Sequence, residues 1–178
     1  MVVKMTEARK SFDFAIKDAE DLLIRFDNEN SSALERNSEA LKRAGMVMAF
    51  SAWETYVKDR FKEEVSVWLC SVNGSLIGNF VQRKVDEDLK RFFNPNAERT
   101  KMLFKNYFEI DITNSWKWDN YHPPQARKML NDLVSKRGGA AHQANTCLET
   151  PHLIKRDELD KAIRFLKGLV RAMDRYKV

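Results

Sequence analysis

The chain has 178 residues, of which 43% are hydrophobic and 32% are charged, and it contains only 6 Gly and 4 Pro. This composition excludes a disordered chain, and the length predicts one domain that spans residues 1–178. The net charge of +5 is compatible with binding to a polyanion but does not require it, because a basic surface also keeps a protein soluble.

Two long helices are predicted in the first part of the chain. Apolar residues recur every three to four positions in the segment Thr6–Asn28, so one face of this helix should be buried. After a polar break, a second helical stretch runs from about Ser32 to Val72. Its middle, 46–53, is apolar on nearly all sides, which predicts a central helix whose buried stripe continues to Trp68. This helix could kink at Gly45, because glycine weakens a helix by about 1 kcal/mol relative to alanine.

Shorter elements follow the long helix. A helix over Leu76–Phe93 should direct Phe80/Val81 inward, and the Asn-Pro-Asn sequence after it ends this helix. Another helix is predicted over Ala97–Phe108. The segment Glu109–His122 has no regular period, and its aromatic residues suggest a loop packed on the bundle.

The last part of the chain should hold two helices. Pro123 opens the first, which leads directly into Lys136–Gln143. A loop over Ala144–Lys155 precedes the last helix, Arg156–Tyr176, which carries a regular apolar stripe. The fold class predicted from these elements is all-α, a helical bundle of about five to six helices with a long central helix.

Common enzyme signatures are absent from the sequence. It has no glycine-rich phosphate loop, no nucleophile elbow and no His-Glu-x-x-His zinc motif. The three histidines and two cysteines do not stand at metal-ligand spacing, so we expect no metal and no cofactor; they are His122, His142, His152, Cys70 and Cys147. Cys70 ends an apolar stretch and is expected to be a buried thiol.

Targeting and membrane signals are also absent. The first residues form no signal-peptide pattern, and no apolar run approaches the roughly 20 residues that span a bilayer. The sequence therefore predicts a cytoplasmic protein without a membrane partner.

Arg137 and His142 are the residues whose chemistry suits a reaction. An imidazole titrates near neutral pH and can remove the proton from a 2′-hydroxyl, while a guanidinium stays charged and binds a phosphate with two hydrogen bonds. On a continuous helix, residues five apart point about 140° away from each other. A bend at Gly138-Gly139 could bring both side chains to one cleft. The alternative from spacing alone is an arginine at a helix end and a histidine that caps the next element.

The sequence around this pair resembles the HEPN superfamily, particularly its RiboL-PSP type. The signature of that superfamily is Arg, four to six residues, then His after a late amphipathic helix, and the segments Leu130–Arg137 and Ala140–His142 are similar to it. An aromatic-Glu pair in an earlier core helix is also typical, and Ser51–Val57 resembles it. The likeness spans about 41–176, most of the chain.

The resemblance implies an all-α homodimer in which two copies of the motif form a composite cleft. It implies a metal-independent endoribonuclease, often in toxin–antitoxin or antiviral defence systems, where an antitoxin or another defence protein is a further partner. Arg137 and His142 carry over as the catalytic pair and Glu54 as an accessory catalytic group. Lys136 and Lys58 are candidate RNA-binding residues, because cations near the cleft attract the phosphate backbone.

Two alternatives stay open at this point. Lys58 stands one helical turn after Glu54, so the two could form a surface ion pair worth a few tenths of a kcal/mol. Gly138 stands where the family usually has a polar residue, and some members keep only a binding or dimerising role. The alternative to an enzyme is therefore a non-catalytic HEPN-like helical module that binds a protein partner or RNA.

Overall fold

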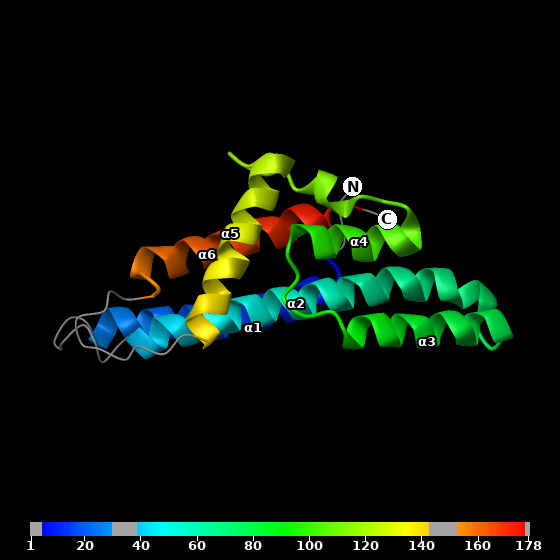
Figure 1. The fold of residues 1–178 in the computed structure, drawn as a ribbon, viewed down its shortest axis with the longest axis horizontal. Coiled ribbons are helices and arrows are strands. Elements are labelled where there is room, and N and C mark those ends of the chain that lie inside the picture. Colours follow the sequence, from blue (N-terminus) through cyan, green and yellow to red (C-terminus); the bar gives the residue numbers. More distant parts are fainter. Residues whose placement is uncertain (1–4, 30–38, 143–152, 177–178) are drawn as a thin grey trace.

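The computed structural model describes residues 5–29, 39–142 and 153–176, and these ranges contain six α-helices and no β-strand (Figure 1). The helices are α1 (Glu7–Glu29), α2 (Glu39–Leu69), α3 (Leu76–Lys90), α4 (Ala97–Phe108), α5 (Pro123–His142) and α6 (Arg156–Asp174). The short 3-10 turns are η2 (Cys70–Val72) and η3 (Ile112–Ser115). The predicted all-α bundle is confirmed. No helix in the described ranges combines the length and the apolar character needed to cross a membrane.

Helix α2 is the central element of the bundle. It lies along α1 and also packs against α5 and α6 (Figure 1). The expectation that 46–53 is buried from several sides is confirmed, because Phe50 is 5% exposed and Trp53 is fully buried. A helix that is apolar around most of its circumference is stable only when neighbours cover all its faces.

The kink that the sequence allowed at Gly45 does not interrupt α2, which continues through this residue. Gly45 is instead a site of close packing between α2 and α6. A Cβ atom at Gly45 would lie 2.8 Å from Cδ2 of Leu159, so the Leu159 side chain would have to shift to admit it. The glycine is thus explained by the approach of α6, and the helix hydrogen bonds remain in place.

The predicted start of α3 at Leu76 is confirmed, but the burial predicted for several side chains near the end of α2 and the start of α3 is wrong. Trp68 and Phe80 were expected to face the core, but they are 50% and 62% exposed. Val81, the other member of the predicted Phe80/Val81 pair, packs against the core. Cys70 was expected to be a buried thiol and is exposed. The predicted start of the second helix at Ser32 lies outside the described residues.

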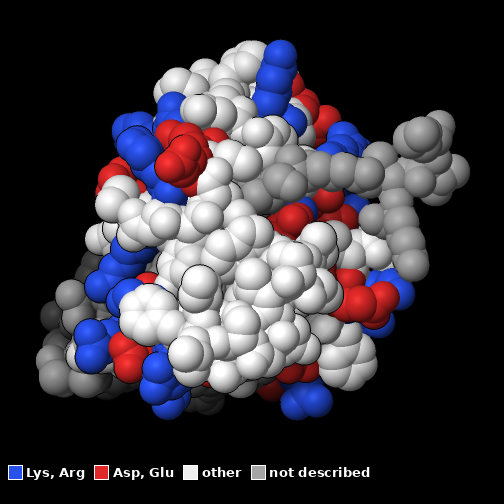
Figure 2. Space-filling model, turned by 90° about the vertical axis from the view of Figure 1, so that its right-hand side faces the viewer, with Lys and Arg blue, Asp and Glu red and all other residues white. Residues whose placement is uncertain are grey.

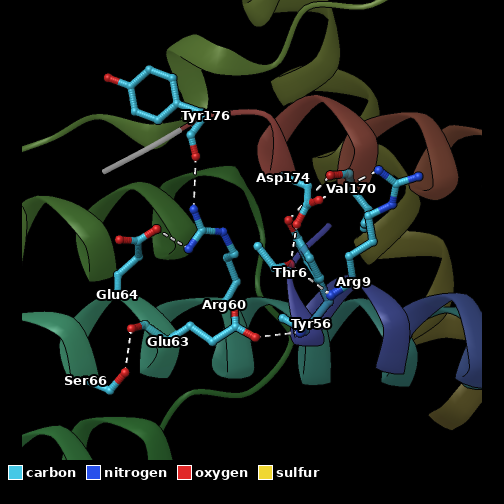
Figure 3. A network of polar contacts seen from close by, with 11 residues as sticks. Thr6, Arg9, Tyr56, Arg60, Glu63, Glu64, Ser66, Val170, Asp174 and Tyr176 are labelled. Atoms are coloured by element: carbon cyan, nitrogen blue, oxygen red, sulfur yellow. Dashed lines mark hydrogen bonds and ion pairs between the residues drawn. The ribbon is translucent and has the colours of Figure 1, made fainter. Parts of the chain in front are cut away.

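A network of polar contacts joins both termini of the bundle to α2 (Figure 3). At the start of α1, the Glu63 carboxylate accepts a hydrogen bond from the Ala8 backbone N–H at 2.6 Å. Asp174, at the end of α6, is buried and accepts a hydrogen bond from the Thr6 hydroxyl. Its other carboxylate oxygen lies 3.7 Å from a guanidinium nitrogen of Arg9.

The same network also holds the C-terminal end of the described chain. Arg60 is buried, pairs with Glu64, and donates a hydrogen bond to the Tyr176 carbonyl at 2.9 Å. The Tyr56 hydroxyl donates to the Val170 carbonyl at 3.4 Å, and burial raises the pKa of Tyr56 well above its ordinary value. These contacts compensate the desolvation of charged groups that would otherwise oppose folding.

Trp53 should be among the most costly residues to truncate. Its indole N–H donates to the Pro95 carbonyl at 2.9 Å, and its ring packs edge-on against Trp116 with 6.2 Å between centroids. We expect Trp53→Ala to lower the free energy of unfolding by about 3–5 kcal/mol, as measured by urea denaturation. Phe14→Ala is the control, because Phe14 is 76% exposed and should change stability by less than about 0.5 kcal/mol. Equal unfolding midpoints for the two variants would contradict the core assignment.

Candidate functional site

The Arg137–His142 pair lies on an unbroken helix. The bend predicted at Gly138-Gly139 is wrong, because α5 continues through both glycines and His142 is its last residue. Glycine permits a break but does not cause one. The last turn of α5 is held by packing, since Ala140 is only 3% exposed.

The two side chains leave α5 in different directions. Five residues correspond to a rotation of about 140° and a rise of about 7.5 Å along the helix axis. Arg137 is half-buried and His142 is exposed. The Nε atom of Arg137 is buried and has no hydrogen-bond partner among the described residues. One copy of the chain therefore does not present the pair on a single helix face.

Arg43 is a residue near this pair that the sequence did not reveal. It lies in the second turn of α2, and its Nε–H donates to the Ala140 carbonyl of α5 at 2.9 Å. The last carbonyls of a helix lack partners within the helix and carry partial negative charge, so a guanidinium is favourable there. The contact joins residues 97 positions apart, and no local sequence signal predicts it.

Lys136 connects α5 to the beginning of α6. Its ammonium group pairs with the Glu158 carboxylate, which also accepts the Lys155 backbone N–H at 3.0 Å. Burial alone would raise the pKa of Glu158, but the hydrogen bonds from Lys136 and Lys155 lower it below its ordinary value. Lys136 therefore lies close to the pair in sequence but already has an acidic partner.

Glu54 and Lys58 form the ion pair that their spacing suggested. The Lys58 ammonium is 2.8 Å from one Glu54 oxygen, and the other oxygen accepts the Asn94 backbone N–H at 2.9 Å. Lys58 also lies 5.1 Å from the centre of the Phe93 ring. Both residues therefore hold the connection between α3 and α4. Glu54 follows Arg43 by eleven positions, which is about 16 Å along the helix axis.

The other histidines and cysteines do not join this site in the described part of the chain. His122 precedes α5, and its backbone N–H donates to the Gln125 side chain at 2.9 Å, as expected for helix entry. His152 and Cys147 lie outside the described residues. Within the described ranges, no group of three or more His, Cys, Asp or Glu side chains is placed to hold a metal ion.

Comparison with known proteins identifies one family. The family model described as RiboL-PSP-HEPN matches residues 14–176, which include α5 and both members of the Arg137–His142 pair. No curated protein and no solved structure gives a match.

Two variants of Glu54 separate its structural role from a catalytic one. Glu54→Ala leaves the Asn94 N–H without its acceptor and should lower the free energy of unfolding by about 1 kcal/mol. Glu54→Gln keeps an acceptor oxygen and loses the ion pair, so thermal melting should place it within a few tenths of a kcal/mol of the wild type. A Glu54→Gln protein that melts normally but has lost RNA cleavage would assign Glu54 a part in the chemistry as well.

Proposed function

The chain belongs to the RiboL-PSP-HEPN family, and we propose that it is a metal-independent endoribonuclease whose site is assembled from two copies of the chain. HEPN domains are often nuclease-related. The observation that carries the proposal is the Arg137–His142 pair in the last turns of α5, inside the region matched by the family. Toxin–antitoxin or antiviral defence is the setting that we propose for this activity.

A second copy resolves the geometry of the pair. Because α5 is unbroken, Arg137 and His142 of one chain point about 140° apart. In a homodimer with a two-fold axis near this end of α5, the two His142 residues would lie close together, and Arg137 of one copy would face His142 of the other.

The proposed reaction uses the 2′-hydroxyl of RNA as nucleophile. One His142 takes the 2′-hydroxyl proton, the 2′-oxygen attacks the phosphorus, and the bond to the 5′-oxygen breaks. The second His142 of the dimer gives a proton to the leaving 5′-oxygen. Arg137 stabilises the negative charge that develops on the phosphate oxygens. The products are a 2′,3′-cyclic phosphate and a 5′-hydroxyl.

Lysines around the cleft would draw RNA toward it and make binding salt-dependent. Lys136 could contact a phosphate by exchanging its partner Glu158. Lys58 stands farther along α2 and would meet a more distant phosphate. Glu54, its ion-pair partner, would act as an accessory group by holding Lys58.

A non-catalytic module that binds a protein partner or RNA is the second candidate. Gly138 favours this binding module, because the position next to Arg137 lacks the polar side chain that the family usually has there. An added Cβ at Gly138 would meet no atom within 4 Å. A larger residue would fit there, so packing does not explain the glycine.

Cleavage of RNA in the presence of a chelator is the main test of the proposal. Wild-type protein should cleave RNA in EDTA, leave 2′,3′-cyclic phosphate ends, and leave DNA intact because DNA has no 2′-hydroxyl. His142→Ala should lose about 10²–10⁴-fold in rate. Arg137→Lys should also be impaired, since an ammonium lacks the two-pronged geometry of a guanidinium.

The matched control is His122→Ala, because His122 is an exposed histidine at the other end of α5. It should cleave at the wild-type rate. Normal cleavage by His142→Ala, or a strict requirement for magnesium, would rule out this mechanism. Complete inactivity of a clean wild-type dimer on many RNAs would favour the binding module.

RNA affinity provides a separate test of Lys136. Glu158→Gln removes the acidic partner of Lys136 but keeps an acceptor for the Lys155 N–H. A surface ion pair is worth roughly 0.2–1 kcal/mol, so RNA binding should tighten by up to about fivefold in fluorescence anisotropy. Asp132→Asn, which frees Lys128 on the same helix, is the control for a general gain in positive charge. Equal gains for both variants would remove Lys136 from the RNA-binding surface.

A further inference from the structure

The end of α2 and the start of α3 form an exposed apolar surface. We define the α2–α3 tip as residues 65–82, which include the end of α2, η2, the turn and the start of α3. Large apolar side chains project into solvent here, and their exposed fractions are Val67 74%, Trp68 50%, Leu76 88%, Ile77 68% and Phe80 62%. Large apolar side chains are usually buried inside the folded chain, so the exposure of five of them in one short segment is informative.

The tip also carries no charge. Residues 65–82 are eighteen consecutive positions without Asp, Glu, Lys or Arg, in a chain that is 32% charged. Figure 2 views this end of the molecule and shows a broad uncharged area with charged side chains around it. An apolar centre with a charged rim is the usual anatomy of a protein–protein interface.

The turn within the tip is fixed by hydrogen bonds of Ser75 and by two glycines. The Ser75 hydroxyl donates to the Val72 carbonyl at 2.6 Å and accepts the Gly78 N–H at 3.0 Å, which caps α3. A Cβ atom at Gly78 would lie 2.2 Å from the Val72 oxygen, and Gly74 has a φ of +78°. Both glycines are therefore needed for this turn. The cap and the two glycines therefore set the path of the chain from the end of α2 into α3.

We propose that the α2–α3 tip is a self-association surface that binds the tip of a second copy of this chain. The five exposed side chains offer on the order of 600 Å², which is at the upper limit for the largest apolar patch of a monomer. With the polar residues around them, this approaches the roughly 800 Å² that each partner buries in a stable interface. A two-fold axis lets one such surface cover another of the same shape.

Charge favours a second copy over the other occupants. An RNA strand requires cations, and a charged peptide requires charges of opposite sign, but the tip has neither. Each copy carries a net charge of +5, so two copies repel each other least where their facing surfaces carry no charge. The uncharged polar residues of the tip supply both donors and acceptors, so they can pair with their own copies: Ser66, Ser71, Asn73, Asn79 and Gln82.

The tip is distant from the Arg137–His142 pair. Arg43 contacts the end of α5, and Trp68 follows it by 25 positions on the same helix, which is about 38 Å. Figure 1 shows the end of α5 and the tip at different ends of α2. A tip-to-tip contact therefore does not bring two motifs together, and it stands independently of the proposed ribonuclease. A chain that uses both two-fold contacts would form a tetramer or a longer assembly.

Sedimentation velocity of the full chain tests the proposal. We expect the double variant Leu76→Asp, Phe80→Glu to have half the mass of the wild-type assembly or less, with unchanged helix content by circular dichroism. Both side chains are more than half exposed, so their replacement should leave the fold intact. The control Phe14→Glu changes an aromatic residue on α1 that is even more exposed than Phe80 and should keep the wild-type mass.

Cys70 gives a second readout that needs no change in the apolar surface. In a Cys147→Ser background it is the remaining cysteine, and it lies exposed within the tip. Its alkylation by a maleimide should slow as the protein concentration rises. A rate that is independent of concentration would count against self-association.

The outcomes separate the tip from the α5 site. A tetramer that becomes a dimer in the tip variant supports both contacts, and a dimer that becomes a monomer supports the tip and removes the α5 dimer. If the wild type is a monomer at about 100 μM, a concentration well above the dissociation constant of a stable contact, the tip proposal is overturned. The same holds for a tip variant with wild-type mass. Flotation of monomeric protein with phosphatidylcholine vesicles, lost in the tip variant, would make a membrane the occupant and also overturn it.

Discussion

Burial of α2 on nearly all its faces is the constraint on which the other elements depend. The helix has 31 residues, and its buried positions include Met46, Trp53, Tyr56 and Val57, which face in several directions. Helices α1, α5 and α6 are therefore packed around it. One end of α2 reaches the last turn of α5 through Arg43, and the other end emerges from the bundle together with α3. A rigid helix thus sets the separation between the two surfaces for which we propose functions.

The continuity of α5 determines what a single copy of the chain can do. Its last turn is fixed by the burial of Ala140 and by the hydrogen bond from Arg43, so the two glycines before it remain helical. A continuous helix separates Arg137 and His142 by rotation. The proposed ribonuclease therefore needs two copies for a geometric reason, in addition to its need for both an acid and a base.

The sequence predicts helix starts well where the signal is local. The predicted starts at Ala97, Pro123 and Arg156 are confirmed, and Asn96 caps α4 by accepting the Arg99 N–H at 2.8 Å. The sequence predicts poorly the features that contacts between distant residues determine. The bend at Gly138-Gly139 was wrong because packing outweighs a propensity cost of about 1 kcal/mol per glycine. An apolar stripe gives the face of a helix but not what covers it, so Trp68 was misjudged. The candidate residues of the site came from the motif, whereas Arg43, which contacts Ala140 of α5, could only be found from the fold.

Titration of wild-type chain with an inactive chain tests the two-copy site most directly. The inactive chain carries Arg137→Ala and His142→Ala, and co-refolding allows the two kinds of chain to form mixed dimers. If the site needs both copies, a tenfold excess of inactive chain should lower cleavage per wild-type chain about tenfold, because nearly every wild-type copy then has an inactive partner. Cleavage per wild-type chain that stays constant across the titration, with mixed dimers verified by sedimentation, would place the whole site within one copy and contradict the proposal.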